Sequence, residues 1–177
     1  MTPRPAAVLV ALVLVVACAA CGILQPVPTP PPTYPRSIML GDEVLQNMFE
    51  IQAEYARETV RCLTGFVVAD TVYVTSVAPT WINRADSVSV NFRGCTAPFT
   101  VGWYHNHPGW IDANGERQTA CWIEDQDVRT LRGFPNFLVA VITCDDRWTI
   151  VWKFKDQNVN YRHTFAPSER YRIAGAP

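Results

Sequence analysis

A strand that ends in two histidines is predicted by residues 100–109, TVGWYHNHPG. Its first half is short and rich in aromatic and β-branched residues, which is typical of a buried strand. Pro108 then ends the strand, because proline has no backbone N–H to give to the ladder. Side chains alternate along a strand, so His105 and His107 share a face. Two imidazoles on one face, joined by a carboxylate from a later element and by a water molecule, would make a catalytic zinc site.

The third ligand is expected in residues 121–131, CWIEDQDVRTL. The pattern predicts a helix start with acidic residues in the first turn, where the helix dipole favours them. Such a helix would turn Asp127 back toward the strand end, and we therefore predict Asp127 as the third ligand. Asp127 could instead serve only the helix dipole, as Asp125 would equally well. Cys121 is a chemically sound alternative ligand, but we rank it lower because the helix-start spacing favours the aspartate.

With these elements the chain resembles the JAMM metallopeptidases, which have the MPN fold. Their signature is an upstream Glu, then H-x-H-P, then S-x-x-D, and bacterial members often carry a Cys three residues before the Ser. The run His105-Asn106-His107-Pro108 matches the central motif, and Cys121 followed by Asp127 matches the spacing of the last one. The resemblance covers roughly residues 40–160, about one domain. It implies a zinc-dependent enzyme that hydrolyses a peptide or isopeptide bond.

The resemblance also implies a general base, Glu58, just before a predicted strand at residues 61–68. A carboxylate there can accept the proton of the zinc-bound water and later deliver it to the leaving amine. Glu54, one helical turn earlier, is the alternative.

The chain departs from the family pattern at the Ser, whose position is occupied by Glu124. In the family that hydroxyl helps to stabilise the oxyanion. A carboxylate cannot donate a hydrogen bond unless protonated, and its charge opposes a developing oxyanion. Glu124 is therefore an extra metal ligand or a group that supports a ligand, or another donor replaces the Ser, or the site binds metal without hydrolysing amides.

Ligand type and charge composition limit the choice of metal and of partner. Nitrogen and oxygen ligands without thiolate suit Zn²⁺, although Mn, Fe and Ni stay open on ligand type. The net charge is −1 with both signs interspersed, so no nucleic-acid partner is expected. His163, on a predicted late strand, is interpreted as an ordinary surface or packing histidine.

The N-terminus predicts export. Residues 6–20 form a continuous apolar run that ends in small residues, which indicates a signal peptide rather than a spanning helix. The run Val15-Val16-Ala17-Cys18 resembles the bacterial lipobox, so residues 1–17 would be removed and Cys18 would carry the lipid. Cys21 is a second candidate, and a plain secretory signal is the simpler alternative. In the lipid version, acyl chains hold the protein at the membrane.

A proline-rich tether is predicted at residues 18–37, stiffened by polyproline II structure. One metallohydrolase domain is then predicted at residues 38–177, long enough for a single core. Asp42 is expected to cap an amphipathic helix, and the Asp127 helix lies in mid-domain. Strands are expected at residues 61–68, 71–77, 86–92, 100–105, 136–143, 148–154 and 160–165. This order predicts an α/β (α+β) fold with a mixed sheet flanked by helices, and the resemblance implies a cytidine-deaminase-like core.

Four cysteines remain after the signal peptide, and an even number in an exported chain suggests disulfides. If the strands at residues 100–105 and 136–143 run parallel, Cys144 and Cys121 end at the same edge. This direction favours the pairs Cys121–Cys144 and Cys62–Cys95.

The sequence therefore predicts an exported, lipid-anchored JAMM-type hydrolase that acts on a peptide or protein substrate in the cell envelope. A catalytically inactive MPN-type binding or scaffold module is the alternative. A disulfide-stapled envelope module with incidental histidines is a third reading. No sequence pattern indicates an oligomeric state.

Overall fold

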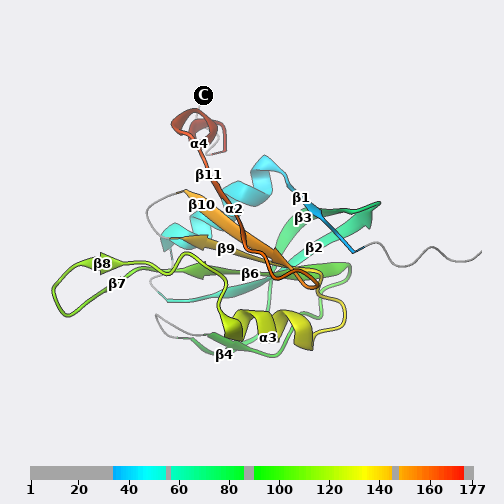
Figure 1. Cartoon of the computed structure of the whole chain (residues 1–177), viewed down its shortest axis with the longest axis horizontal. Helices are drawn as coiled ribbons and strands as arrows, with labels where there is room; N and C mark the ends of the chain where they lie inside the picture. The colour runs from blue at the N-terminus through cyan, green and yellow to red at the C-terminus, as the bar shows by residue number, and fades with distance from the viewer. Residues whose placement is uncertain (1–33, 55–56, 86–89, 145–147, 174–177) are drawn as a thin grey trace, which may run out of the picture. The chain divides into compact units, whose positions relative to one another are not determined.

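The computed structural model describes residues 34–173, except 55–56, 86–89 and 145–147. This part is an α+β unit built on a mixed seven-stranded sheet of order β1-β3-β2-β6-β9-β10-β11 (Figure 1). The predicted signal peptide, Cys18, Cys21 and most of the predicted tether lie outside the described residues. Among the described residues, no helix has both the length and the apolar character needed to cross a membrane.

The helices are α2 (Asp42–Glu54), α3 (Asp125–Gly133) and α4 (Pro167–Ile173). The strands of the main sheet are β1 (Ser37–Leu40), β2 (Val60–Val68), β3 (Thr71–Pro79), β6 (Thr100–His107), β9 (Val139–Cys144), β10 (Thr149–Phe154) and β11 (Tyr161–Thr164). Two short hairpins accompany the sheet, β4 (Ile82–Ala85) with β5 (Val90–Phe92), and β7 (Trp110–Ile111) with β8 (Arg117–Gln118).

The centre of the sheet is the parallel pair β6 and β9, in which every residue is buried. Both strands are covered on two faces, which explains why β9 and the first half of β6 consist mainly of apolar residues. Gly102 permits their close approach, because a Cβ at this position would lie 2.0 Å from the carbonyl oxygen of Val139. Strand β6 also pairs antiparallel with β2 on its other side.

The two faces of the sheet carry separate cores, with α2 and α3 on opposite sides (Figure 1). Helix α2 contributes Met48 to one core, where Tyr104 of β6 packs. Leu131 of α3 belongs to the other core, where Trp103 of β6 packs. Alternation along β6 therefore directs His105 and His107 to the α3 face.

Several boundaries differ from the predictions. Strand β1 begins at Ser37, one residue before the predicted domain start, because the chain already pairs in parallel with β3 there. Asp42 is the first helical residue and not the cap, since the carbonyl of Gly41 accepts the N–H of Leu45. Helix α4 was not predicted.

The segments around the site also differ from the predictions. Of the strand predicted at residues 86–92, the part at Val90–Phe92 is confirmed as β5, residues 86–89 lie outside the described residues, and β4 precedes them. Between the histidines and α3 lies the β7–β8 hairpin, which projects from the sheet at the left of Figure 1. Asp112 closes its turn by accepting the N–H groups of Asn114 and Glu116, each at 2.9 Å.

Two disulfides join the described cysteines, Cys62 to Cys95 and Cys121 to Cys144. Both pairs are those predicted, and the parallel direction of β6 and β9 on which the pairing was based is confirmed. The second disulfide ties the segment before α3 to the end of β9.

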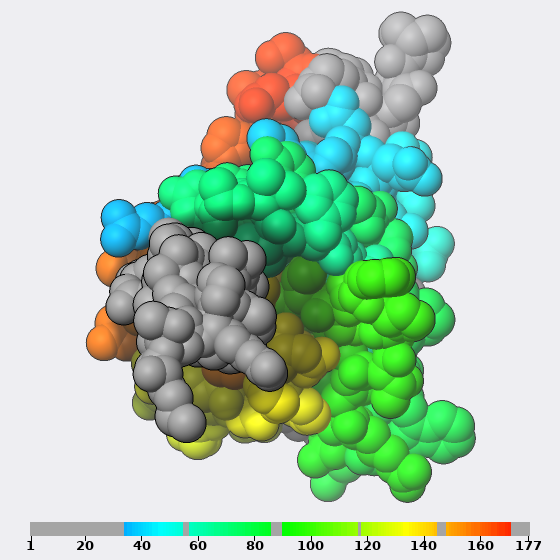
Figure 2. Space-filling view, turned by 90° about the vertical axis from the view of Figure 1, so that its right-hand side faces the viewer, coloured from blue at the N-terminus to red at the C-terminus, as the bar shows by residue number. Residues whose placement is uncertain are grey.

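Figure 2 shows the face to the right of Figure 1, with the β2–β3 hairpin in teal above the yellow of α3. The turn of this hairpin exposes Phe66 and Val68, and Phe99 lies exposed before β6.

Candidate metal centre

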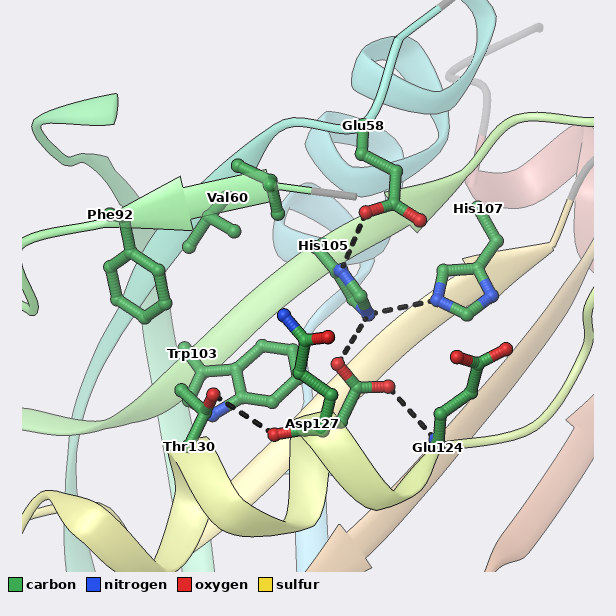
Figure 3. Close-up of a pocket in the computed structure, with 11 residues that line it drawn as sticks. Glu58, Val60, Phe92, Trp103, His105, His107, Glu124, Asp127 and Thr130 are labelled. Carbon is green, nitrogen blue, oxygen red and sulfur yellow. Dashed lines mark hydrogen bonds and ion pairs between the residues drawn. The ribbon is translucent and has the colours of Figure 1, made fainter. Parts of the chain in front are cut away.

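The two histidines at the end of β6 point to the same side, as predicted (Figure 3). Their Nε2 atoms lie 2.9 Å apart, and both residues are buried, with 3% and 4% of their surface exposed. The ring of Trp103, two residues earlier on the same face, meets the ring of His105 edge-on, with centroids 4.8 Å apart. This indole forms the inner wall of the site. Among the described residues its N–H has no hydrogen-bond partner.

A backbone carbonyl fixes the protonation of His107. Its Nδ1 lies 2.6 Å from the carbonyl oxygen of Ala120, so the Nδ1–H donates and Nε2 presents a lone pair to the site. Burial lowers the pKa of His107, an effect that the Ala120 carbonyl and the negative charge of Glu124 partly offset. The ring is therefore set to bind a cation through Nε2.

His105 has a carboxylate near each of its ring nitrogens. Oε2 of Glu58 lies 4.0 Å from its Nδ1, and Oδ1 of Asp127 lies 3.6 Å from its Nε2. Burial, reinforced by the neighbouring His107, holds the pKa of His105 well below its ordinary value. The ring is neutral near pH 7, which is the form that ligates metals.

Glu58 and the two histidines form a buried group that could hold a metal ion, with one ligand atom from each residue within 4.8 Å of the others. The sequence predicted Glu58 as a base, and the structure brings it within reach as a possible ligand. It lies between α2 and β2, above the gap between the two imidazoles (Figure 3). The predicted alternative Glu54 is exposed at the end of α2.

Asn106, the residue between the two histidines, holds the Glu58 segment in place. It points to the opposite face of β6 and is fully buried. Its Oδ1 accepts the N–H of Thr59 at 2.7 Å, and its Nδ2 donates to the carbonyl of Arg57 at 3.2 Å. These bonds flank Glu58 on both sides. The prediction missed this role, although a polar residue inside an otherwise buried strand was a usable signal.

Asp127 reaches the site from the first turn of α3, as predicted. Its Oδ2 accepts the backbone N–H of Glu124 at 2.9 Å, which leaves Oδ1 toward His105. Burial raises the pKa of Asp127 to about 6, and the charge of Glu124 adds to this effect. Asp125, the competing candidate, is exposed.

Glu124 stands at the N-cap of α3 with an exposed side chain that approaches the site from the side of His107 (Figure 3). It is brought to the site, as predicted, but offers a carboxylate where the family pattern has a hydroxyl. Cys121 is not available as a thiolate, because its sulfur is bonded to Cys144. His163 lies on β11 with its Nε2 3.6 Å from Glu169, apart from the site.

The donor set fits a metal ion. Two nitrogens bound to one zinc at about 2.05 Å with a tetrahedral angle would lie about 3.3 Å apart, so the imidazoles need to separate by only a few tenths of an ångström. Imidazole and carboxylate donors suit zinc and other first-row ions. An open cavity gives access to these donors, and Trp103 and Phe92 also line it.

No protein-family model matches the sequence, and no curated protein matches it.

Proposed function

We propose that the chain is a zinc-dependent hydrolase of JAMM type that cuts a peptide or isopeptide bond, with an MPN-like core. The supporting observation is the convergence of two neutral imidazoles with the buried carboxylate of Glu58 and the partly buried carboxylate of Asp127 at the end of β6, inside an accessible cavity. In this proposal His105, His107 and Asp127 hold the metal. Zn²⁺ would act there as a Lewis acid and lower the pKa of a water molecule.

Glu58 is the proposed general base. It lies on the Nδ1 side of His105, whereas His107 and Asp127 both meet the Nε2 of that ring. Glu58 accepts the proton of the attacking water and passes it to the nitrogen of the leaving amine. The indole of Trp103 and the ring of Phe92 limit water on one side of the cavity.

Export and lipid attachment at Cys18 complete the proposal. They rest on the apolar run and the lipobox-like motif of the sequence alone. The acyl chains would hold the enzyme at the membrane, and a peptide of the cell envelope, or the tail of an envelope protein, would be its substrate.

Metal analysis of the purified protein tests this function. We expect about one zinc per chain in the wild type and none in His105→Ala or His107→Ala, with the fold retained because the site lies at a strand end. His163→Ala is the matched control and should keep its metal. Full zinc occupancy in the double variant of His105 and His107 would refute the assignment.

An inactive metal-binding module is the second candidate, and Glu124 is the observation that favours it. Its carboxylate offers no hydrogen to an oxyanion, and a donor there is worth on the order of 3 kcal/mol. Glu124→Ser should therefore raise hydrolysis of an uncharged peptide, or create it. If Glu124→Ser strips the metal or lowers that activity, Glu124 is a ligand or a catalytic acid.

A further inference from the structure

A second open cavity adjoins the candidate metal centre on the side of His107. It shares Glu58, His107 and Glu124 with the cavity over the metal ligands, so a molecule at the metal would extend into it. Its other walls include two indoles, Trp110 of the β7–β8 hairpin and Trp122, just before α3. We call this second cavity the indole pocket.

The indole pocket has the composition of a cation site. Both tryptophans are exposed, at 37% and 52%, although indoles are usually covered in a folded protein. The face of an indole carries negative electrostatic potential and attracts ammonium groups. Carboxylates of Glu58 and Glu124 add formal negative charge, and no lysine or arginine lines either cavity among the described residues.

Other kinds of ligand fit the indole pocket less well than a cation. A purely apolar side chain would take water away from the carboxylates of Glu58 and Glu124, at a cost in desolvation. An anionic group would be repelled by the same carboxylates. A cation pairs with them and lies against the two indoles at once.

Glu124 gains a role in this arrangement. Its negative charge reaches the metal centre, where it raises the pKa of both His107 and Asp127. The same charge opposes an oxyanion but stabilises an ammonium group beside it. The residue that breaks the family pattern is thus explained as a determinant of specificity.

We infer that the indole pocket, through Trp110, Trp122 and Glu124, binds a primary ammonium group of the substrate next to the bond that is cut. This inference deepens the proposed function and rests on it. Either a lysine-like side chain or a free N-terminus could supply the ammonium group, since both have the same chemistry.

Binding is tested without turnover, by following the tryptophan fluorescence of the full zinc-loaded chain. The first probe is Nα-acetyl-lysine methylamide, with Nα-acetyl-norleucine methylamide as its neutral counterpart. Alanine methylamide, with a free amine, and its N-acetyl form represent the N-terminal source. We expect the charged member of at least one pair to bind more tightly, by about three- to tenfold, and more weakly as salt is raised.

Variants locate the site. Glu124→Gln and Trp122→Leu should each remove most of the preference for the charged probe. Glu116→Gln and Trp81→Leu are the matched controls, since both residues are exposed and line neither cavity. Equal binding of charged and neutral probes, or an unchanged preference in Glu124→Gln, would overturn the inference. A clear ammonium preference in a protein that hydrolyses no peptide would instead refute the enzyme and leave the pocket standing.

Discussion

Two imidazole nitrogens that face each other at 2.9 Å need something positive between them. A proton on the Nε2 of His105 makes this contact a hydrogen bond, and a metal ion in its place draws both lone pairs inward. Because the Nδ1–H of His107 is committed to Ala120, its Nε2 is an acceptor in either case. At the scale of residues, the site is therefore prepared for a cation by protonation states that the backbone and burial impose.

The carboxylates of Asp127 and Glu58 are expected to differ in role. Asp127→Asn should abolish tight zinc binding, because it removes a negatively charged ligand. Glu58→Gln should keep the metal and lower turnover by roughly a hundredfold or more, the scale of a lost proton-transfer group. Zinc affinity and peptide hydrolysis, measured on both variants, separate the two roles. The reverse pattern, with zinc lost in Glu58→Gln and kept in Asp127→Asn, would make Glu58 the third ligand.

The pKa of Asp127 predicts how the metal-free protein depends on pH. Burial raises this pKa from 3.8 to about 6, so the folded state favours the protonated acid. The resulting stability is fully present below about pH 4 and is lost as pH rises through 6, on the order of 2 kcal/mol. Asp127→Asn cannot titrate at this position. Urea unfolding at pH 4 and pH 7 should therefore show the wild type losing stability relative to this variant.

Zinc provides the control for that comparison. In excess zinc the carboxylate of Asp127 is paired with the metal, so the wild type should regain its stability at pH 7 and the variant should not. An equal change in both proteins between the two pH values would contradict the assignment of this pKa.

At the scale of elements, the alternating side chains of β6 serve two functions, one on each face of the strand. Its odd-numbered positions Trp103, His105 and His107 build the metal face, while Tyr104 and Asn106 secure the opposite face. The hydroxyl of Tyr104 donates to the carbonyl of Met48 at 2.8 Å, and burial raises its pKa well above the ordinary value. The strand is thus held in place on the face of Tyr104 and Asn106, while the face of the histidines stays open to a ligand.

Asn106→Ala should lower stability and turnover, although Asn106 does not contact the candidate metal site. The change leaves the buried N–H of Thr59 without its side-chain partner, which costs about 1–3 kcal/mol, and it removes the partly buried hydrogen bond to the carbonyl of Arg57. It also loosens the segment that carries Glu58. We expect a lower midpoint of thermal unfolding and, at temperatures where the variant is folded, lower turnover. Asn83→Ala, at an exposed amide, should change neither quantity.

Features that depend on residues close in sequence were predicted, whereas features that depend on contacts between distant residues were missed. The strand, its end at Pro108 and the shared face of the histidines depend on residues close in sequence, and these were predicted. Placing Asp127 needed only the start of one helix. The hydrogen bonds by which Asn106 holds the Glu58 segment were missed because their partners lie 47 and 49 residues away. Strand β1 was missed because it lies at the end of a proline-rich run and depends on β3 for its pairing.

At the scale of the whole molecule, the folded unit and the lipid anchor are independent predictions. We expect the mature chain to begin at a diacylated Cys18, which mass spectrometry of membrane-extracted protein can show. Cys18→Ala should release the protein from the membrane fraction, whereas Cys21→Ala should not. A mature N-terminus elsewhere and without lipid would refute the anchor but not export.

The Cys121–Cys144 disulfide would give the candidate metal centre a maturation step. Cys144 is the register partner of His107 across β6 and β9, and Cys121 follows the alanine whose carbonyl orients that same imidazole. A newly made chain with reduced thiols would hold this carbonyl, and the start of α3 with Asp127, less firmly. We therefore expect weak metal binding until oxidation closes the loop. A hydrolase built this way would remain harmless where it is synthesised and become competent only after it arrives where thiols are oxidised.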